Sequence, residues 1–102
     1  MIDIRIEIKH EIREAFKKLY NYSCSLDSIS IDDTPKNFEG FYTLIIFPHL
    51  KKLNSSPDEV GNSIGKYLIE NTSIVSNYNI VKGFLNLDLS EKYIITLFNT
   101  II

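Results

Sequence analysis

Apolar residues recur every three or four positions along the first part of the chain, which is typical of one face of an α-helix. Isoleucines also alternate with charged residues over residues 2–8, and that shorter stretch would suit a strand. The helical spacing continues well beyond it, so we predict a helix from about Asp3 to Tyr22. Its apolar stripe consists of Ile4, Ile8, Ile12, Ala15, Phe16 and Leu19.

Four later runs have the composition or the alternation of β-strands. Pro48 ends the run Phe41–Phe47. Gly83 separates the runs Tyr78–Val81 and Phe84–Leu89, as a tight turn or a bulge requires. Between the first two runs, Asp32–Asn37 is rich in turn residues and is expected to be a loop. The predicted strands are Ser28–Ile31, Phe41–Phe47, Tyr78–Val81 and Phe84–Leu89, the last with Leu85, Leu87 and Leu89 on one face.

Two helical segments are predicted between these strands. His49–Leu53 is long enough for one or two turns. The stretch from Ser56 to Glu59 starts the next helix, because it places a capping serine, then a proline, then a glutamate that can reach back to the cap. Gly61 and Gly65 lie one turn apart in that helix, and each destabilises a helix relative to alanine. Their presence therefore predicts that another element packs closely against them.

A last helix is predicted after Ser90, which can cap it. No glycine or proline stops this helix, and the sequence ends on two isoleucines in the middle of the apolar pattern. We therefore expect the 102 residues to be part of a longer chain. The apolar positions of the helix are Ile94, Leu97, Phe98 and Ile101.

Length and composition indicate a single α+β domain over residues 1–102, since 102 residues with 44% hydrophobic and 24% charged positions are enough for one packed core. The net charge of −2 counts against strong binding of nucleic acid, because phosphate contacts need Lys and Arg. The basic residues Lys9, Arg13, Lys17 and Lys18 are expected to form a solvated helix face. A single cysteine and the absence of a long apolar run favour a cytoplasmic protein without a membrane segment.

No catalytic residue and no metal site is predicted in this segment. His10 and His49 are far apart in sequence, and neither belongs to a cluster of metal-ligand type. Cys24 would need a nearby histidine to act as a nucleophile, and a structural cysteine is the commoner case. Asp32 and Asp33 are paired carboxylates, but aspartates in a turn are far more common than a cation site.

Two segments combine residue types that a scaffold does not require. Thr34–Thr43 holds three aromatic residues, a lysine, an asparagine and a glycine. Such a mixture suits an unstacked nucleotide, because rings stack on a base, amides read its edge and amines meet phosphate. Alternatively, these aromatic side chains enter the core where the strand begins. The second segment, Val81–Asn86, either contributes to the same site or serves only as a hairpin turn.

These segments resemble a known family. The motif Thr34-Pro35-Lys36-x-Phe38-Glu39-Gly40-x-Tyr42-Thr43, then Ser56 to Glu59, then Gly83-Phe84-Leu85-Asn86, is similar to the N-terminal additional domain of bacterial arginyl-tRNA synthetases. The likeness is greatest to the enzymes of the Bacteroidetes group, and it covers essentially the whole chain. It implies an α+β domain with a small antiparallel sheet of about four strands, flanked by about four helices.

The resemblance also implies a function. The domain would grip the outer corner of an arginine-accepting tRNA near its D-loop, while the catalytic domain of the same chain attaches arginine using ATP with Mg²⁺. No cofactor, membrane or DNA contact is implied for the domain itself. Phe38 is the candidate for stacking, Asn37 and Thr43 are candidates for hydrogen bonding, and the full set of candidate residues is Lys36, Asn37, Phe38, Gly40, Phe41, Thr43 and Lys82.

Two departures from the family pattern affect this site. Many members have Gly-Asp-Tyr where this chain has Gly40-Phe41-Tyr42, and Lys82 stands before Gly83 where many have Gly-Pro. The ATP-binding signatures His-Ile-Gly-His and Lys-Met-Ser-Lys are absent, as expected of a segment without the catalytic domain. The main alternative function is a protein-interaction module that docks through the apolar face of the last helix.

Overall fold

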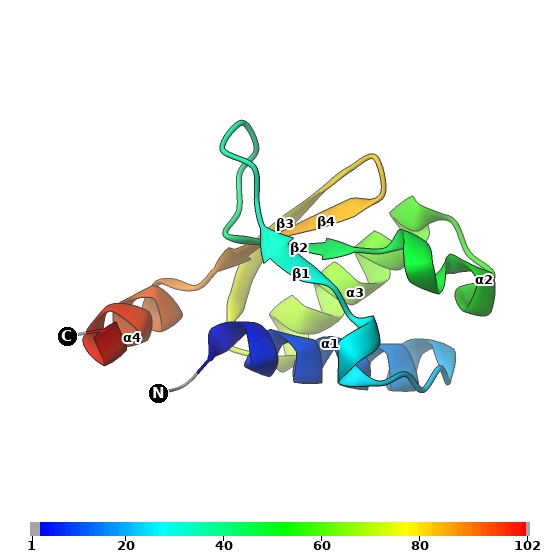
Figure 1. The fold of residues 1–102 in the computed structure, drawn as a ribbon, viewed down its shortest axis with the longest axis horizontal. Helices are drawn as coiled ribbons and strands as arrows, with labels where there is room; N and C mark the ends of the chain where they lie inside the picture. Colours follow the sequence, from blue (N-terminus) through cyan, green and yellow to red (C-terminus); the bar gives the residue numbers. More distant parts are fainter. Residues whose placement is uncertain (1–2, 102) are drawn as a thin grey trace.

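The computed structural model describes residues 3–101, in which four α-helices flank one four-stranded sheet (Figure 1). The sheet is antiparallel throughout, with the strand order β1-β2-β4-β3. This arrangement confirms the predicted α+β fold. In chain order the elements are α1 (Ile4–Tyr20), the 3-10 turn η1 (Leu26–Ser28), β1 (Ile31–Asp33), β2 (Tyr42–Ile45), η2 (Phe47–His49), α2 (Leu50–Leu53), α3 (Pro57–Asn71), β3 (Val75–Val81), β4 (Phe84–Leu89) and α4 (Glu91–Ile101).

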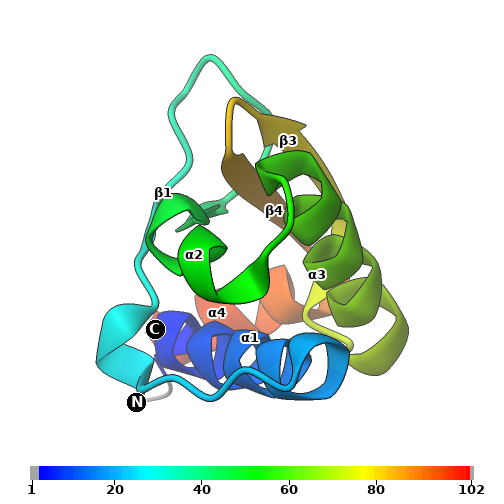
Figure 2. The same ribbon diagram turned by 90° about the vertical axis from the view of Figure 1, so that its right-hand side faces the viewer.

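The strand register divides the sheet into an inner face and an outer face. Leu44 of β2 lies opposite Leu85 of β4, and both are completely buried against the helices. Figures 1 and 2 place α1 and α3 on this inner side of the sheet. Because successive side chains point to opposite faces, the neighbouring positions form the outer face. Two rows of paired residues cross it, namely Asp32, Thr43, Asn86 and Asn79, and below them Ile45, Phe84 and Val81.

The two long helices begin where the sequence predicts. The Asp3 carboxylate accepts from the Arg5 N–H at 3.0 Å, and α1 starts at Ile4. The helix buries the predicted apolar stripe except Leu19, which is exposed in its last turn. The Ser56 hydroxyl accepts from the Glu59 N–H at 3.2 Å, which confirms the predicted cap of α3. Removing such a cap typically costs about 1 kcal/mol.

The two glycines of α3 lie against strand β3, as their spacing predicts. A Cβ added at Gly61 would come 2.8 Å from the Ile80 Cδ1, and one at Gly65 would come 2.6 Å from ring carbons of Tyr78. Carbon atoms in contact prefer a separation of about 3.5–4.0 Å, so a side chain at either position would force its neighbour on β3 to move. The glycines therefore let the helix approach the strand more closely than any other residue would.

The predicted position of the first strand was wrong. Ser28 ends the turn η1, and β1 begins only at Ile31 and includes Asp32 and Asp33, which the sequence places in a loop. The reason is that β1 forms by pairing with β2, and an edge strand tolerates carboxylates that face solvent. Asp33 also forms an ion pair with Arg5 of α1, which holds the strand against the helix.

The other strand limits differ less. Strand β2 ends at Ile45, because Ile46 has helical backbone angles and leads into η2. Strand β3 begins at Val75, earlier than predicted, and a bulge between Val75 and Asn77 accompanies the extra length.

The helix α4 starts after Ser90, whose hydroxyl accepts from the Tyr93 N–H at 3.3 Å, as predicted. Of the apolar positions predicted for this helix, Ile94 is half-buried against the core. The side chains of Leu97, Phe98 and Ile101 lie outside the described residues.

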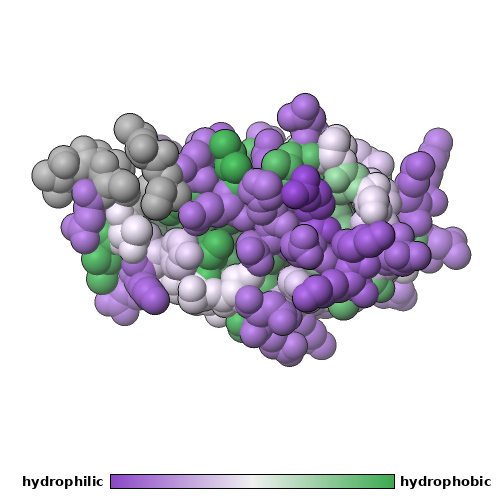
Figure 3. Space-filling model, turned by 90° about the horizontal axis from the view of Figure 1, so that it is seen from below, coloured by the Kyte–Doolittle hydropathy of each residue, from purple (hydrophilic) through white to green (hydrophobic). Residues whose placement is uncertain are grey.

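The helical side of the molecule is largely polar. Seen from below, its surface is mostly hydrophilic and its apolar groups are small and scattered (Figure 3). Lys17 and Lys18 at the end of α1 are exposed, as expected of a solvated helix face. None of the described helices is long and apolar enough to cross a bilayer.

Candidate nucleic-acid interface

A loop of residues 35–40 stands up from the sheet between β1 and β2 (Figure 1). Backbone hydrogen bonds close its base, because the Thr34 N–H donates to the Phe41 carbonyl at 3.1 Å. The Phe41 N–H in turn donates to the Leu87 carbonyl of β4 at 2.8 Å. Within the loop, the Phe38 N–H donates to the Pro35 carbonyl at 3.0 Å and makes a tight turn. The loop therefore has a defined conformation anchored on the sheet.

Side chains tie the same loop to the outer face at both of its ends. The hydroxyls of Thr34 and Thr43 are 2.9 Å apart, and Thr43 donates to the Asn86 Oδ1 at 2.6 Å. The Asn86 Nδ2 donates to the Asn79 Oδ1 at 2.9 Å, and the Asn79 Nδ2 donates to the Glu39 carbonyl at 2.8 Å. This chain of hydrogen bonds, called here the outer-face relay, crosses β2, β4 and β3.

A backbone carbonyl determines the direction of the relay. The Glu39 carbonyl can only accept, so Asn79 must turn its NH₂ group toward it and its oxygen toward Asn86. Asn86 therefore turns its Oδ1 toward Thr43, whose hydroxyl must donate to it. Because Thr43 has only one hydroxyl hydrogen, Thr34 must donate to Thr43. The relay leaves one N–H and one lone pair of the Asn86 amide unused, and Asn86 lines the hollow although the residue is only 1% exposed.

Gly40 fits closely between the loop and the relay. Its φ of 136° is a conformation that residues with a side chain rarely adopt. A Cβ at this position would come 3.1 Å from the Thr34 Oγ1 and 3.3 Å from the Asn86 Cβ. Any other residue would push the loop away from the sheet.

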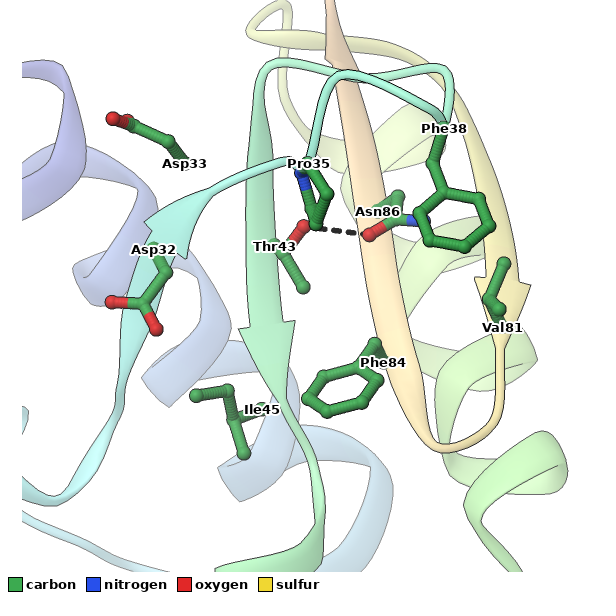
Figure 4. A pocket seen from close by; sticks show the side chains of 9 residues that line it. All are labelled: Asp32, Asp33, Pro35, Phe38, Thr43, Ile45, Val81, Phe84 and Asn86. Carbon is green, nitrogen blue, oxygen red and sulfur yellow. Dashed lines mark hydrogen bonds between the residues drawn. The ribbon is translucent and has the colours of Figure 1, made fainter.

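The loop and the outer face enclose a hollow of about 180 Å³ (Figure 4). Figure 4 shows the Phe38 ring descending from the loop beside Asn86, and the Phe84 ring at the other end of the hollow, below Thr43 and Asn86. Both rings are partly exposed, Phe38 by 39% and Phe84 by 40%. Mostly apolar walls with a few fixed polar groups are typical of a ligand site, and this volume suits one planar ring. The lining residues are Asp32, Asp33, Pro35, Phe38, Thr43, Ile45, Val81, Phe84 and Asn86.

The turn between β3 and β4 positions one end of the hollow. Lys82 and Gly83 both have positive φ angles, of 48° and 82°, as in a type I′ turn. This confirms the predicted tight turn. The two-residue connection sets Phe84 opposite Val81 on the outer face and leaves the Lys82 side chain exposed.

The candidate residues from the sequence have different surroundings. Phe38 lines the hollow, and the exposed Lys36 and Asn37 lie on the same loop of residues 35–40. Phe41 is 42% exposed but does not line the hollow. The alternative that these aromatic residues all enter the core is therefore wrong for Phe38 and Phe41, although Tyr42 does pack against the core.

Thr43 is 5% exposed, and its hydroxyl is bonded on both sides by the relay. Its hydrogen-bonding capacity is thus used within the protein, where it orients Asn86.

Of the nine lining residues only Phe38 and Thr43 belonged to the predicted site, and Phe84 and Asn86 are the most important of those it lacked. The sequence singles out their segment, and their alternation with Leu85 and Leu87 places them on the face opposite the core. That alternation was the available signal. Their meeting with Phe38 depends on the pairing of β2 with β4, which no local pattern states.

Charge differs between the two sides of the hollow. Asp33 is paired with Arg5, whose guanidinium also lies 5.3 Å from the centre of the Tyr42 ring. Asp32 is exposed at the same side. Lysines stand on the loop and on the β3–β4 turn. A phosphate would therefore favour the lysine side, and a hydrogen-bond donor the side of Asp32.

Among the described residues, no three potential metal ligands come together. His49 is 1% exposed, packs on the Phe16 ring and shares a hydrogen bond of 2.8 Å between its Nδ1 and the Tyr22 hydroxyl. Burial lowers the pKa of His49 below its ordinary range. Cys24 is half-buried near Tyr22.

The lowered pKa of His49 predicts a loss of stability in acid. The unfolded state, with a histidine pKa of about 6.5, takes up a proton that the folded state resists, so stability falls as the pH drops below that value. We expect His49→Gln to flatten this fall between about pH 7.5 and pH 5.5, measured by urea unfolding. Equal slopes in the unchanged chain and in His49→Gln would contradict the assignment.

Comparison with known proteins places the chain. The family described as "Arginyl tRNA synthetase N terminal domain" matches residues 6–89. The arginine–tRNA ligase of Amoebophilus asiaticus is 35% identical over 98 residues, covering 96% of this chain. That of Phocaeicola vulgatus is 38% identical over 101 residues, covering 98%. The chain spans only 16% and 17% of the length of these two relatives.

A solved structure has the same fold. The arginyl-tRNA synthetase of Thermus thermophilus superimposes with a TM-score of 0.75 over 93% of this chain and 15% of its own, at 20% sequence identity. The family match, the relatives and the antiparallel sheet flanked by helices agree with one another. The chain belongs to the family of arginyl-tRNA synthetase N-terminal domains.

Proposed function

We propose that this chain is the tRNA-binding domain of an arginine–tRNA ligase, and that the hollow on its outer face receives one unstacked nucleotide from the D-loop at the outer corner of the tRNA. The observation that carries the proposal is the hollow itself, which is lined by two partly exposed rings and by an oriented amide. Sequence-specific recognition of RNA commonly uses such sites, in which a splayed base stacks on rings and is read by hydrogen bonds.

Each lining residue has a defined part in this proposal. Phe38 and Phe84 stack on the base, and stacking is worth about 1–3 kcal/mol per base. Asn86 reads the base edge with the N–H and the lone pair that the relay leaves free. Thr43 and Asn79 hold Asn86 in one orientation, and Gly40 lets the loop close over the site. Asn37 and Phe41 are placed to contact the neighbouring parts of the RNA.

Lys36 and Lys82 meet phosphates in this proposal. With few such contacts and a net charge of −2, the domain binds weakly by itself, and its dependence on salt is shallow. Its contribution is a second grip, which raises the effective concentration of the tRNA at the catalytic part of the same ligase. That part binds ATP with Mg²⁺ and carries out the arginylation in the cytoplasm.

Binding measurements on the complete ligase test the proposal. Phe38→Ala is expected to weaken the binding of arginine-accepting tRNA by about 1–3 kcal/mol, and Lys36→Ala by less, because one exposed phosphate contact is screened by salt. ATP and arginine binding should stay unchanged in both variants. Leu19→Ala, which trims an exposed apolar residue on α1, is the matched control. Unaltered tRNA affinity in both loop variants would remove the site assignment.

The alternative of a protein-interaction module depended on the apolar face of the last helix. Several of its side chains lie outside the described residues, whereas the hollow is formed entirely by described ones. Gel filtration of the chain distinguishes the two functions, since a tight dimer would favour the interaction module.

A further inference from the structure

Phe47 is the most exposed phenylalanine among the described residues, with 52% of its surface accessible. It is the first residue of η2 and is separated by Ile46 from Ile45, the last outer-face residue of β2. Its ring packs edge-to-face on Phe84, with the ring centroids 6.3 Å apart. Since Phe84 lines the hollow, the apolar surface continues without a break from the proposed nucleotide site to Phe47.

The backbone is shaped to accept the Phe47 ring. A Cβ at Gly83 would lie 2.4 Å from the Phe47 Cζ, so the ring rests directly on the β3–β4 turn. The positive φ of 82° at Gly83 also disfavours any other residue there. A ring that is fixed from below and exposed above is a rigid surface for stacking.

Two lysines belong to the segments that hold this ring. Lys82 stands in the same turn, and Lys51 follows Phe47 by one helical turn through η2 and α2. Both side chains are exposed, and neither takes part in an ion pair within the described part of the chain. An aromatic face beside free amines is the combination that binds single-stranded nucleic acid.

We propose that Phe47, Lys51 and Lys82 form a second nucleotide subsite, which holds the neighbour of the nucleotide in the hollow. This inference rests on the proposed function. The planes of the Phe47 and Phe84 rings meet at 81°, so two bases stacked on them are turned away from each other. The two subsites thus select a strand whose bases are splayed apart, as in a loop, over one whose bases stay stacked in a helix.

The test compares a one-nucleotide with a three-nucleotide ligand. Uridine monophosphate can fill only one subsite, whereas the single-stranded trinucleotide UUU can reach both. NMR titration of the chain with each ligand gives their affinities at millimolar concentration. We expect the trinucleotide to bind more tightly, and Phe47→Leu to weaken the trinucleotide about five-fold or more while leaving the monophosphate unchanged. Phe47→Tyr keeps the ring and should retain the tighter binding.

The remaining outcomes separate the two proposals. Phe84→Leu should weaken both ligands, because it alters the hollow itself. If Phe84→Leu weakens the binding of both ligands while Phe47→Leu leaves the affinity for the trinucleotide unchanged, the second subsite is refuted and the proposed function stands. If the unchanged chain binds neither ligand, both proposals are refuted. In Phe47→Leu the new leucine side chain still covers Gly83. Thermal unfolding of each variant verifies that the fold is kept.

Discussion

Replacing Gly65 by alanine is expected to destabilise the fold by about 1–2 kcal/mol, although the same change in an ordinary helix would stabilise it by about 1 kcal/mol. The added Cβ would lie 2.6–2.7 Å from three carbons of the Tyr78 ring, one of them the carbon nearest the backbone. That part of the ring cannot swing aside without moving β3. Overpacking therefore outweighs the gain in helix propensity, as measured by urea unfolding.

Two controls make this expectation specific. Gly61→Ala meets mainly the flexible end of Ile80, which can change rotamer, so its effect should be close to neutral. In a Tyr78→Ala background the obstacle is gone, and Gly65→Ala should then become stabilising. A double-mutant cycle with no coupling between Gly65 and Tyr78 would contradict the packing argument.

The second large effect is expected from Asn79→Asp. The new carboxylate has no hydrogen to donate to the Glu39 carbonyl, and its oxygen would face that carbonyl oxygen instead. The relay then loses its link to the loop, which should cost about 1–3 kcal/mol of stability at neutral pH and weaken RNA binding.

The pH dependence identifies the cause. Repulsion by the carbonyl raises the pKa of the new carboxyl in the folded state above its unfolded value of about 3.9. A protonated carboxyl can donate again, so the stability difference from the unchanged chain should shrink as the pH falls toward about 4. Asn79→Ala removes the same link to the Glu39 carbonyl without adding a titratable group, so it is the control and its deficit should not change over this pH range. An Asn79→Asp deficit that is independent of pH would show that the donated hydrogen does not matter.

Local chemistry made much of the fold predictable. The Ser56 cap, the paired glycines of α3 and the alternation along β4 each depend on residues near one another in sequence, and the structure confirms all three. Strand β1 was not predictable in this way, because its two aspartates favour turns by themselves. They are held extended by β2 and by Arg5, which lies 28 positions away from Asp33.

The site was predicted only in part for the same reason. The ring and glycine of the loop stood out in the sequence, and Phe38 does line the hollow. Asn79 carried no signal, because its importance comes from a backbone carbonyl 40 positions earlier. Residues such as Phe84 become part of a site only once two distant strands are aligned, and composition does not specify that alignment.

The edges of the sheet also bear on how the domain behaves in solution. Strand β1 has three residues, of which two are carboxylates, and β3 carries a bulge near its start. The backbone of a second copy that paired along β1 would lie about 4.8 Å from that of β1 and thus near these carboxylates. Short, charged or irregular margins of this kind oppose sheet-to-sheet aggregation, so the open outer face can stay accessible without the chains sticking to one another.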